Sequence, residues 1–230
     1  MSGDQTFVEA AEAKRGRLQI PTTLQPFAER VEQRFGVKPL WIATDHITVV
    51  GPNNVRRRVD LVFERTDDYA DFLTGPFNFS SARQEAIARD FNDTVSATAQ
   101  AQLFHVPSGK RLSDGLFVCF SDFEPAAREA VHTAVPMTDT DRMAVQAGLG
   151  DAYWESSRLW GPPTVFLYTD EQVKGFSSDE FRGELDDAYF ELALAHDEFS
   201  VLERRVTFVG LDSKENFDNN YASNWYYYWK

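Results

Sequence analysis

Two β-prone runs near the N-terminus, separated by a short turn, constrain the fold more than any other feature. Residues 38–50 read KPLWIATDHITVV and residues 55–65 read VRRRVDLVFER, with Gly-Pro-Asn-Asn between them. A turn of this kind between β-branched and aromatic runs predicts a β-hairpin. In the second run Val59, Leu61 and Phe63 share one face, and the other face carries Arg56, Arg58, Asp60 and Val62. At least part of this sheet should therefore face water on one side.

Helical patterns flank this hairpin. Residues 24–35 carry apolar side chains at helical spacing, and Gly36 follows at the position of a C-terminal cap. The strongest helical pattern covers residues 177–199, where Ser177 and Glu180 are spaced as a capping box. The chain should therefore combine hairpins with amphipathic helices.

Two further strand pairs complete the predicted fold. AQLFHV (101–106) and LFVCFSDF (116–123) flank one turn-rich segment, and RRVTFVGLDSKENF (204–217) and SNWYYYWK (223–230) form a last hairpin. The predicted class is α+β, with a mostly antiparallel sheet built from hairpins and helices packed on one face. The order of helices and strand pairs leaves room for a structural repeat, although no sequence repeat is visible.

Length and composition predict one globular domain. A chain of 230 residues can bury a core, and no linker rich in proline or serine divides it. We expect an arm or short helix over 1–20 and a single α+β domain over 21–230. No stretch approaches the roughly 18 apolar residues of a membrane span. The start of the chain lacks the apolar region of a secretory signal, and Cys119 has no second cysteine to pair with, so a cytoplasmic protein is expected.

The acidic charge is concentrated in the later part of the chain. The net charge is −13, and residues 1–65 hold ten Lys/Arg against eight Asp/Glu. Residues 66–230 hold thirteen against twenty-eight. Such a field repels nucleic acids and anionic membranes and attracts basic partners. The predicted partner is therefore a basic protein, with no nucleic acid and no membrane, and the oligomeric state stays open.

One helix concentrates this charge. Between residues 179 and 198 there are eight acidic residues and one basic residue. Four of the acids recur at helical spacing on one face: Glu180, Glu184, Asp187 and Glu191. Like charges at i, i+4 cost about 0.2–0.5 kcal/mol each. The face is either simply solvated or a binding surface for a basic partner. The leading hypothesis is a non-enzymatic inhibitor or neutraliser, which resembles bacterial immunity proteins in general composition.

The aromatic C-terminus supports a second hypothesis. FDNNYASNW, residues 217–225, resembles the Trp-Asp-Asn-Asn-x-x-x-Asn-aromatic hairpin of starch- and glycogen-binding modules over nine residues, with Phe217 in place of tryptophan. The resemblance implies carbohydrate binding, in which aromatic faces contact the sugar and amide and carboxylate groups bond its hydroxyls. The candidate ligand-binding residues of this C-terminal segment are Asp218, Asn219, Asn220, Asn224, Trp225 and Trp229. The structural alternative is an aromatic strand that is paired and covered by helices.

Catalytic motifs are absent from the sequence. There is no HExxH zinc motif, nucleophile elbow, phosphate loop or dinucleotide fingerprint. Cys119 lies in an apolar run, where a thiol is expected to be inert. No cofactor, metal or catalytic residue is therefore predicted. A hydrolase with a dispersed carboxylate and histidine site stays as a further alternative.

Overall fold

The computed structural model describes residues 5–49, 54–75, 78–105, 109–204 and 208–230. The chain divides into two compact units, Met1–Ala126 (unit 1) and Ala127–Lys230 (unit 2). The α+β class is confirmed, and three of the five described strand pairings are antiparallel. The prediction of a single domain over 21–230 stays a prediction, because compact halves do not show whether the halves unfold together.

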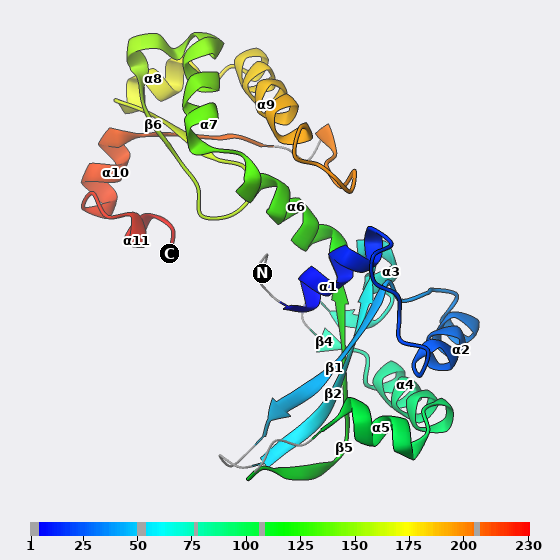
Figure 1. The fold of residues 1–230 in the computed structure, drawn as a ribbon. Coiled ribbons are helices and arrows are strands. Elements are labelled where there is room, and N and C mark those ends of the chain that lie inside the picture. The colour runs from blue at the N-terminus through cyan, green and yellow to red at the C-terminus, as the bar shows by residue number, and fades with distance from the viewer. Residues whose placement is uncertain (1–4, 50–53, 76–77, 106–108, 205–207) are drawn as a thin grey trace. The chain divides into compact units, whose positions relative to one another are not determined.

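Unit 1 is built around a three-stranded sheet in the order β1-β2-β5 (Figure 1). Its elements are α1 (Gln5–Lys14), α2 (Gln25–Phe35), β1 (Trp41–Thr48), β2 (Asn54–Phe63), α3 (Thr66–Ala70), β3 (Leu73–Gly75), β4 (Asn78–Phe79), α4 (Ser81–Thr94), α5 (Ala97–Leu103), β5 (Arg111–Asp122) and the start of α6 (Phe123–Ala134). The predicted first hairpin is confirmed as the antiparallel pair β1-β2. Its turn falls largely outside the described residues.

The second predicted hairpin is wrong. AQLFHV is not a strand, because Ala97–Leu103 forms α5, and Ser96 caps that helix by accepting the amide hydrogen of Ala99 at 3.2 Å. The alanine and glutamine side chains of this segment favour a helix over its short apolar run. LFVCFSDF does form a strand within β5, but that strand pairs in parallel with β2. Residues 106–108 of the predicted hairpin lie outside the described residues.

The sheet of unit 1 has an apolar and a polar face. Val59, Leu61 and Phe63 are fully buried with the helices α2, α4 and α5. This burial confirms the alternation expected from the sequence. The other face carries polar groups and is covered by α1, through the buried Ala10 and Ala11.

Unit 2 has a second three-stranded sheet, in the order β6-β7-β8. Its elements after α6 are α7 (Met137–Ala144), a π-helix (Val145–Leu149), a 3-10 helix (Gly150–Ala152), β6 (Tyr153–Ser157), β7 (Thr164–Leu167), α8 (Asp170–Gly175), α9 (Asp179–Leu194), β8 (Gly210–Ser213), α10 (Lys214–Tyr221) and α11 (Trp225–Tyr228). β6 is antiparallel to β7, and β8 is parallel to it. Val165 and Leu167 pack with α6, α7 and α9.

The two units repeat one topology. In each, two helices lead into an antiparallel strand pair, further helices follow, and a last strand pairs in parallel with the middle strand. The parallel ladders end at the pairs Phe63–Asp122 and Leu167–Ser213, and a helix begins at the next residue in both units. Asp60 on β2 and Thr164 on β7 each lie three residues before the end of the parallel ladder, so the two residues occupy equivalent positions. The structural repeat for which the sequence left room is therefore present.

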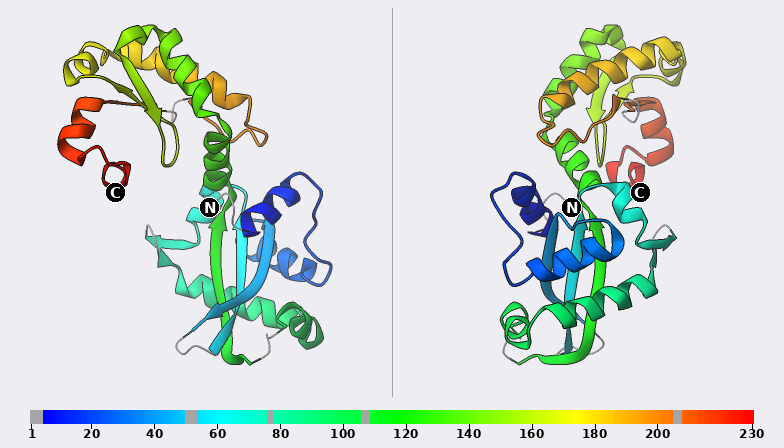
Figure 2. Two further views of the ribbon diagram at one scale, coloured as in Figure 1. Left: turned by 60° about the vertical axis from the view of Figure 1, so that its left-hand side comes forward. Right: turned by 90° about the vertical axis from the view of Figure 1, so that its right-hand side faces the viewer.

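The predicted C-terminal hairpin is wrong. After β8 the chain forms α10 and α11, which lie on the far side of the sheet from α9 (Figures 1 and 2). Ser213 caps α10 by accepting the amide hydrogen of Asn216 at 2.8 Å, and Asn224 caps α11. Ala222 and Ser223 both have positive φ and separate the two helices. These caps override the β propensity of the aromatic residues.

Candidate functional site

The acidic face predicted from the sequence lies on α9. Ser178, one residue after the predicted cap, accepts the amide hydrogen of Phe181 at 3.3 Å and starts the helix. Leu185 and Tyr189 are buried in the core of unit 2. The four predicted residues are all exposed: Glu180, Glu184, Asp187 and Glu191.

Half of this face is neutralised within the unit. Arg204 forms ion pairs with Asp187 and Glu191, and its guanidinium lies 4.7 Å from the centroid of the Phe190 ring. In the part of the chain that the structure describes, no basic side chain forms an ion pair with Glu180 or Glu184. The unneutralised charge therefore lies at the N-terminal half of α9.

Apolar side chains are exposed near the acidic face. The Asp186 carboxylate accepts a hydrogen bond from the amide of Val209, which places the segment before β8 beside α9. Burial raises the pKa of Asp186. The adjacent Phe208 is 69% exposed, and Leu194 at the end of α9 is also exposed. Aromatic side chains are enriched in protein-binding surfaces relative to the rest of the surface.

The aromatic tail covers the second face of the sheet of unit 2. The Phe166 ring on β7 meets those of Phe217, Trp225 and Tyr228. Trp225 stacks on Phe217 with ring centroids 4.2 Å apart, and Trp229 stacks on Trp225 at 6.3 Å. The tail is therefore a structural layer, built from helices and not from the strand expected.

Most polar residues of the predicted sugar site already have partners within the tail. Asp218 accepts hydrogen bonds from Lys214 and Ser223, which lower its pKa. Asn220 donates to the side chain of Asn216 at 2.6 Å, and Asn224 caps α11. Asn219 is exposed. Carbohydrate binding stays a prediction that these contacts do not favour.

A small cavity lies between α1 and the polar face of the sheet of unit 1. Its volume is 130 Å³, and its lining includes Arg58, Asp60, Ser121 and Asp122. Asp60 is only 7% exposed, and both of its carboxyl oxygens lie 3.0 Å from the Ser121 hydroxyl. Burial raises the pKa of Asp60. The sequence reasoning placed Asp60 on a face toward water and missed this site, because α1 covers that face.

The neighbouring thiol of Cys119 is buried in the sheet, as expected from its apolar run in the sequence. Cys119 pairs with Asp60 across the ladder, is buried, and lies 3.7 Å from the carbonyl oxygen of Val59. Burial and the nearby Asp60 charge raise the pKa of the thiol. The thiolate needed for nucleophilic chemistry is therefore disfavoured at neutral pH.

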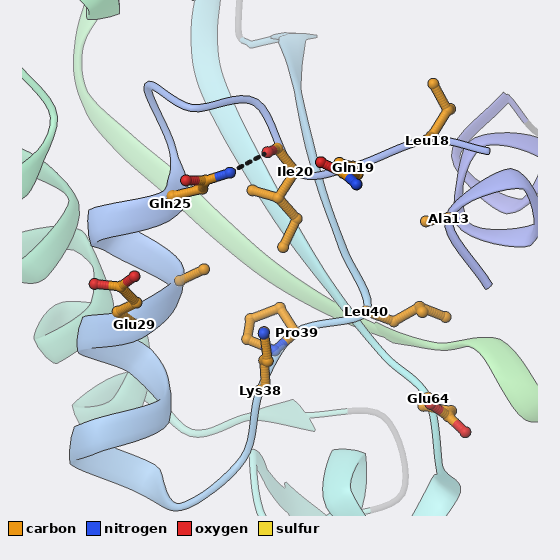
Figure 3. A pocket seen from close by; sticks show the side chains of 11 residues that line it. Ala13, Leu18, Gln19, Ile20, Gln25, Glu29, Lys38, Pro39, Leu40 and Glu64 are labelled. Atoms are coloured by element: carbon orange, nitrogen blue, oxygen red, sulfur yellow. Dashed lines mark hydrogen bonds between the residues drawn. The ribbon is translucent and has the colours of Figure 1, made fainter. Parts of the chain in front are cut away.

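A larger hollow of 480 Å³ lies beside the connection between α1 and α2 (Figure 3). Leu18, Ile20 and Pro39 contribute to its wall. Glu29 and Glu64 lie at opposite ends of it (Figure 3). Because its polar groups do not converge on one point, the hollow lacks the arrangement that fixes a small ligand.

His132 is the histidine of unit 2 that is buried in the structure. His132 lies 3.0 Å from the Tyr189 hydroxyl. Burial, reinforced by Arg158 and Arg128, lowers its pKa to about 4. Within the described ranges, no group of three or more His, Cys, Asp or Glu side chains is placed to hold a metal ion. The hydrolase alternative stays a prediction.

Comparison of this chain with family models, with curated proteins and with solved structures found no match. Within the described residues, no helix is both long enough and apolar enough to cross a membrane.

Proposed function

We propose that this protein is a non-enzymatic binding protein whose partner is a basic protein, and that the N-terminal half of α9 contacts the partner. The observation that carries the proposal is the contrast along one helix face. Arg204 pairs with Asp187 and Glu191, while Glu180 and Glu184 are exposed and form no ion pair within the described residues. Unit 2 as a whole holds nine Lys/Arg against nineteen Asp/Glu.

Electrostatics and apolar contact would contribute differently to such a complex. Rim charges accelerate encounter and select the sign of the partner, and their effect falls as salt increases. Binding energy comes mainly from a few buried aromatic or arginine anchors. Phe208, exposed beside Asp186, supplies an anchor of this kind. The proposed partner therefore presents lysine or arginine residues around an apolar depression.

The remaining parts of the proposal follow from the same charge. A basic protein that is harmful when free, such as a nuclease or a toxin, is the class of target that an acidic inhibitor neutralises. Nucleic acid is not a proposed ligand, because unit 2 would repel its phosphates. The proposed compartment is the cytoplasm, with support from the single buried cysteine.

A charge-reversal comparison tests the proposal. The double variant Glu180→Lys/Glu184→Lys should lose retention of a basic protein from the host lysate at low salt. Glu29→Lys/Glu32→Lys is the matched control, since it reverses two exposed glutamates on α2 of unit 1. If both variants retained the same partner as the wild type, α9 would not be the contact surface.

A further inference from the structure

The strand β5 forms one long edge of the sheet of unit 1. β5 has twelve residues, and among the described residues its one strand neighbour is β2, so its other side is the edge of the sheet (Figure 2). The corresponding last strand of unit 2, β8, has only four residues. A long open edge presents backbone groups to which a strand from another chain can pair.

A groove of 300 Å³ lies between this edge and α4. Residues 116–118 form its strand side. Its helix side consists of residues at i, i+3, i+4 and i+7 on one face of α4: Ser81, Gln84, Glu85 and Ala88. An extended peptide that adds to a sheet edge gains main-chain hydrogen bonds from the strand and side-chain contacts from the flanking pocket. The groove offers both kinds of contact.

Two carbonyl groups of β5 at this groove accept hydrogen bonds from side chains. Gln84 Nε2 on α4 donates to the Val118 carbonyl oxygen at 2.5 Å, and Arg56 Nη2 donates to that of Leu116 at 3.2 Å. Alternate residues of a strand direct their carbonyl groups to the same side, so the two acceptors lie along one edge. Both donors end long, flexible side chains, so an incoming strand can displace them without unfolding the backbone.

Arg56 is placed to bind a negative group at one end of the groove. It starts on β2 and passes Gly115 so closely that a Cβ atom there would lie 3.3 Å from Nη2. Its Nε is buried without an acceptor, and no carboxylate of the described residues forms an ion pair with it. The register of β5 against β2 shifts beside Arg56, so regular strand geometry stops there. A ligand strand that runs antiparallel to β5 therefore ends at this guanidinium with its C-terminus.

Glu85 gives the groove a second charge of opposite sign. It is exposed on α4, and in the part of the chain that the structure describes no basic side chain forms an ion pair with it. A ligand that matches both charges has a carboxylate at its end and a basic side chain along its length. Arginine–carboxylate hydrogen bonds are among the strong ones, because both groups are charged.

We propose that this groove binds the C-terminus of another protein as an extended segment that adds antiparallel to β5. The segment places its terminal carboxylate on Arg56 and a lysine or arginine side chain beside Glu85. Residues 116–118 span roughly 10 Å at about 3.3 Å each, so the groove holds about three ligand residues. The site lies in unit 1 and is independent of the surface proposed on α9.

The experiment uses the full chain and an acetylated valine-lysine-valine tripeptide with a free carboxylate. Titrations followed by amide and methyl NMR should give a millimolar or lower Kd and shift resonances of Ala88, Leu116 and Val118. The same tripeptide with a C-terminal amide should bind at least tenfold more weakly, because it lacks the charge that Arg56 recognises. Equal affinity for the acid and the amide, or shifts confined to residues outside the groove, would overturn the proposal.

Two variants identify the site. Arg56→Gln should weaken binding of the free acid at least tenfold and leave binding of the amide unchanged. Arg89→Gln is the matched control, because Arg89 is exposed on α4 outside the groove, and it should change neither affinity.

Glu85→Lys tests the site even if Arg56→Gln fails to fold, since Glu85 is exposed. This variant should bind acetylated valine-glutamate-valine more tightly than the lysine peptide, the reverse of the wild type. An unchanged preference would refute the placement of the ligand. Dimerisation of the free chain that blocks peptide binding would assign the edge to a second copy and would also overturn the proposal.

Discussion

Removal of the Phe217 ring should detach the aromatic tail from the second sheet. Phe217 is only 4% exposed and contacts Trp154, Phe166, Trp225 and Tyr228. A phenylalanine buries about 150–250 Å². At about 25 cal/mol per Å², burial of this area contributes roughly 4–6 kcal/mol. Alanine retains part of this, and the cavity left behind adds a cost, so Phe217→Ala should lower the free energy of unfolding by about 3–5 kcal/mol.

Urea unfolding followed by tryptophan fluorescence measures this loss, since Trp225 stacks directly on Phe217. The melting temperature should fall by roughly 10 °C for a chain of this length. Tyr226→Ala is the control, because Tyr226 is 67% exposed on the same short helix, and it should change stability by less than about 0.5 kcal/mol. If Phe217→Ala cost no more than Tyr226→Ala, the tail would not stabilise the sheet.

Three further perturbations have expected outcomes. The pKa of His132 is lowered to about 4, so its contribution to stability is present above pH 6.5 and lost as the pH falls toward 4. Between pH 7 and 5 the wild type should lose about 2 kcal/mol more than His132→Phe, and equal losses in urea titrations would show that His132 titrates freely. The pKa of Asp60 is raised because burial disfavours its ionised form in the folded state. The free energy of unfolding should therefore fall as the pH rises above about 3.8 and the carboxyl group ionises. Asp60→Asn should therefore be more stable than the wild type at pH 7, with the difference shrinking toward pH 4, and a less stable variant at pH 7 would contradict this sign. Gly210→Ala should cost about 1–3 kcal/mol through its clash with Thr164, and less in a Thr164→Ala background; equal costs in the two backgrounds would place the strain elsewhere.

Local patterns predicted the elements whose signals are contained in neighbouring residues. The alternation Val59, Leu61, Phe63 identified a strand with one buried face, and Gly36 marked the end of α2 with φ 75°. The helices of the tail are also locally encoded, since Ser213 and Asn224 are helix caps, although the aromatic run alone predicts a strand. Caps are the stronger evidence where they compete with β propensity.

Contacts between distant residues account for what the sequence could not predict. The parallel pairing of β2 with β5 joins segments about sixty residues apart, and no local pattern specifies it. Arg204 neutralises Asp187 and Glu191 from another segment. The burial of Asp60 depends on α1, which precedes it by some fifty residues.

The most direct test of the proposed function is the salt dependence of partner binding. Once a retained basic protein is identified, its Kd should be measured at low and high salt for the wild type, for Glu180→Lys/Glu184→Lys and for Glu29→Lys/Glu32→Lys. We expect the α9 variant alone to bind more than tenfold more weakly at low salt and to show a reduced salt dependence. Equal affinities and equal salt dependence for all three proteins would contradict a role of α9 in binding.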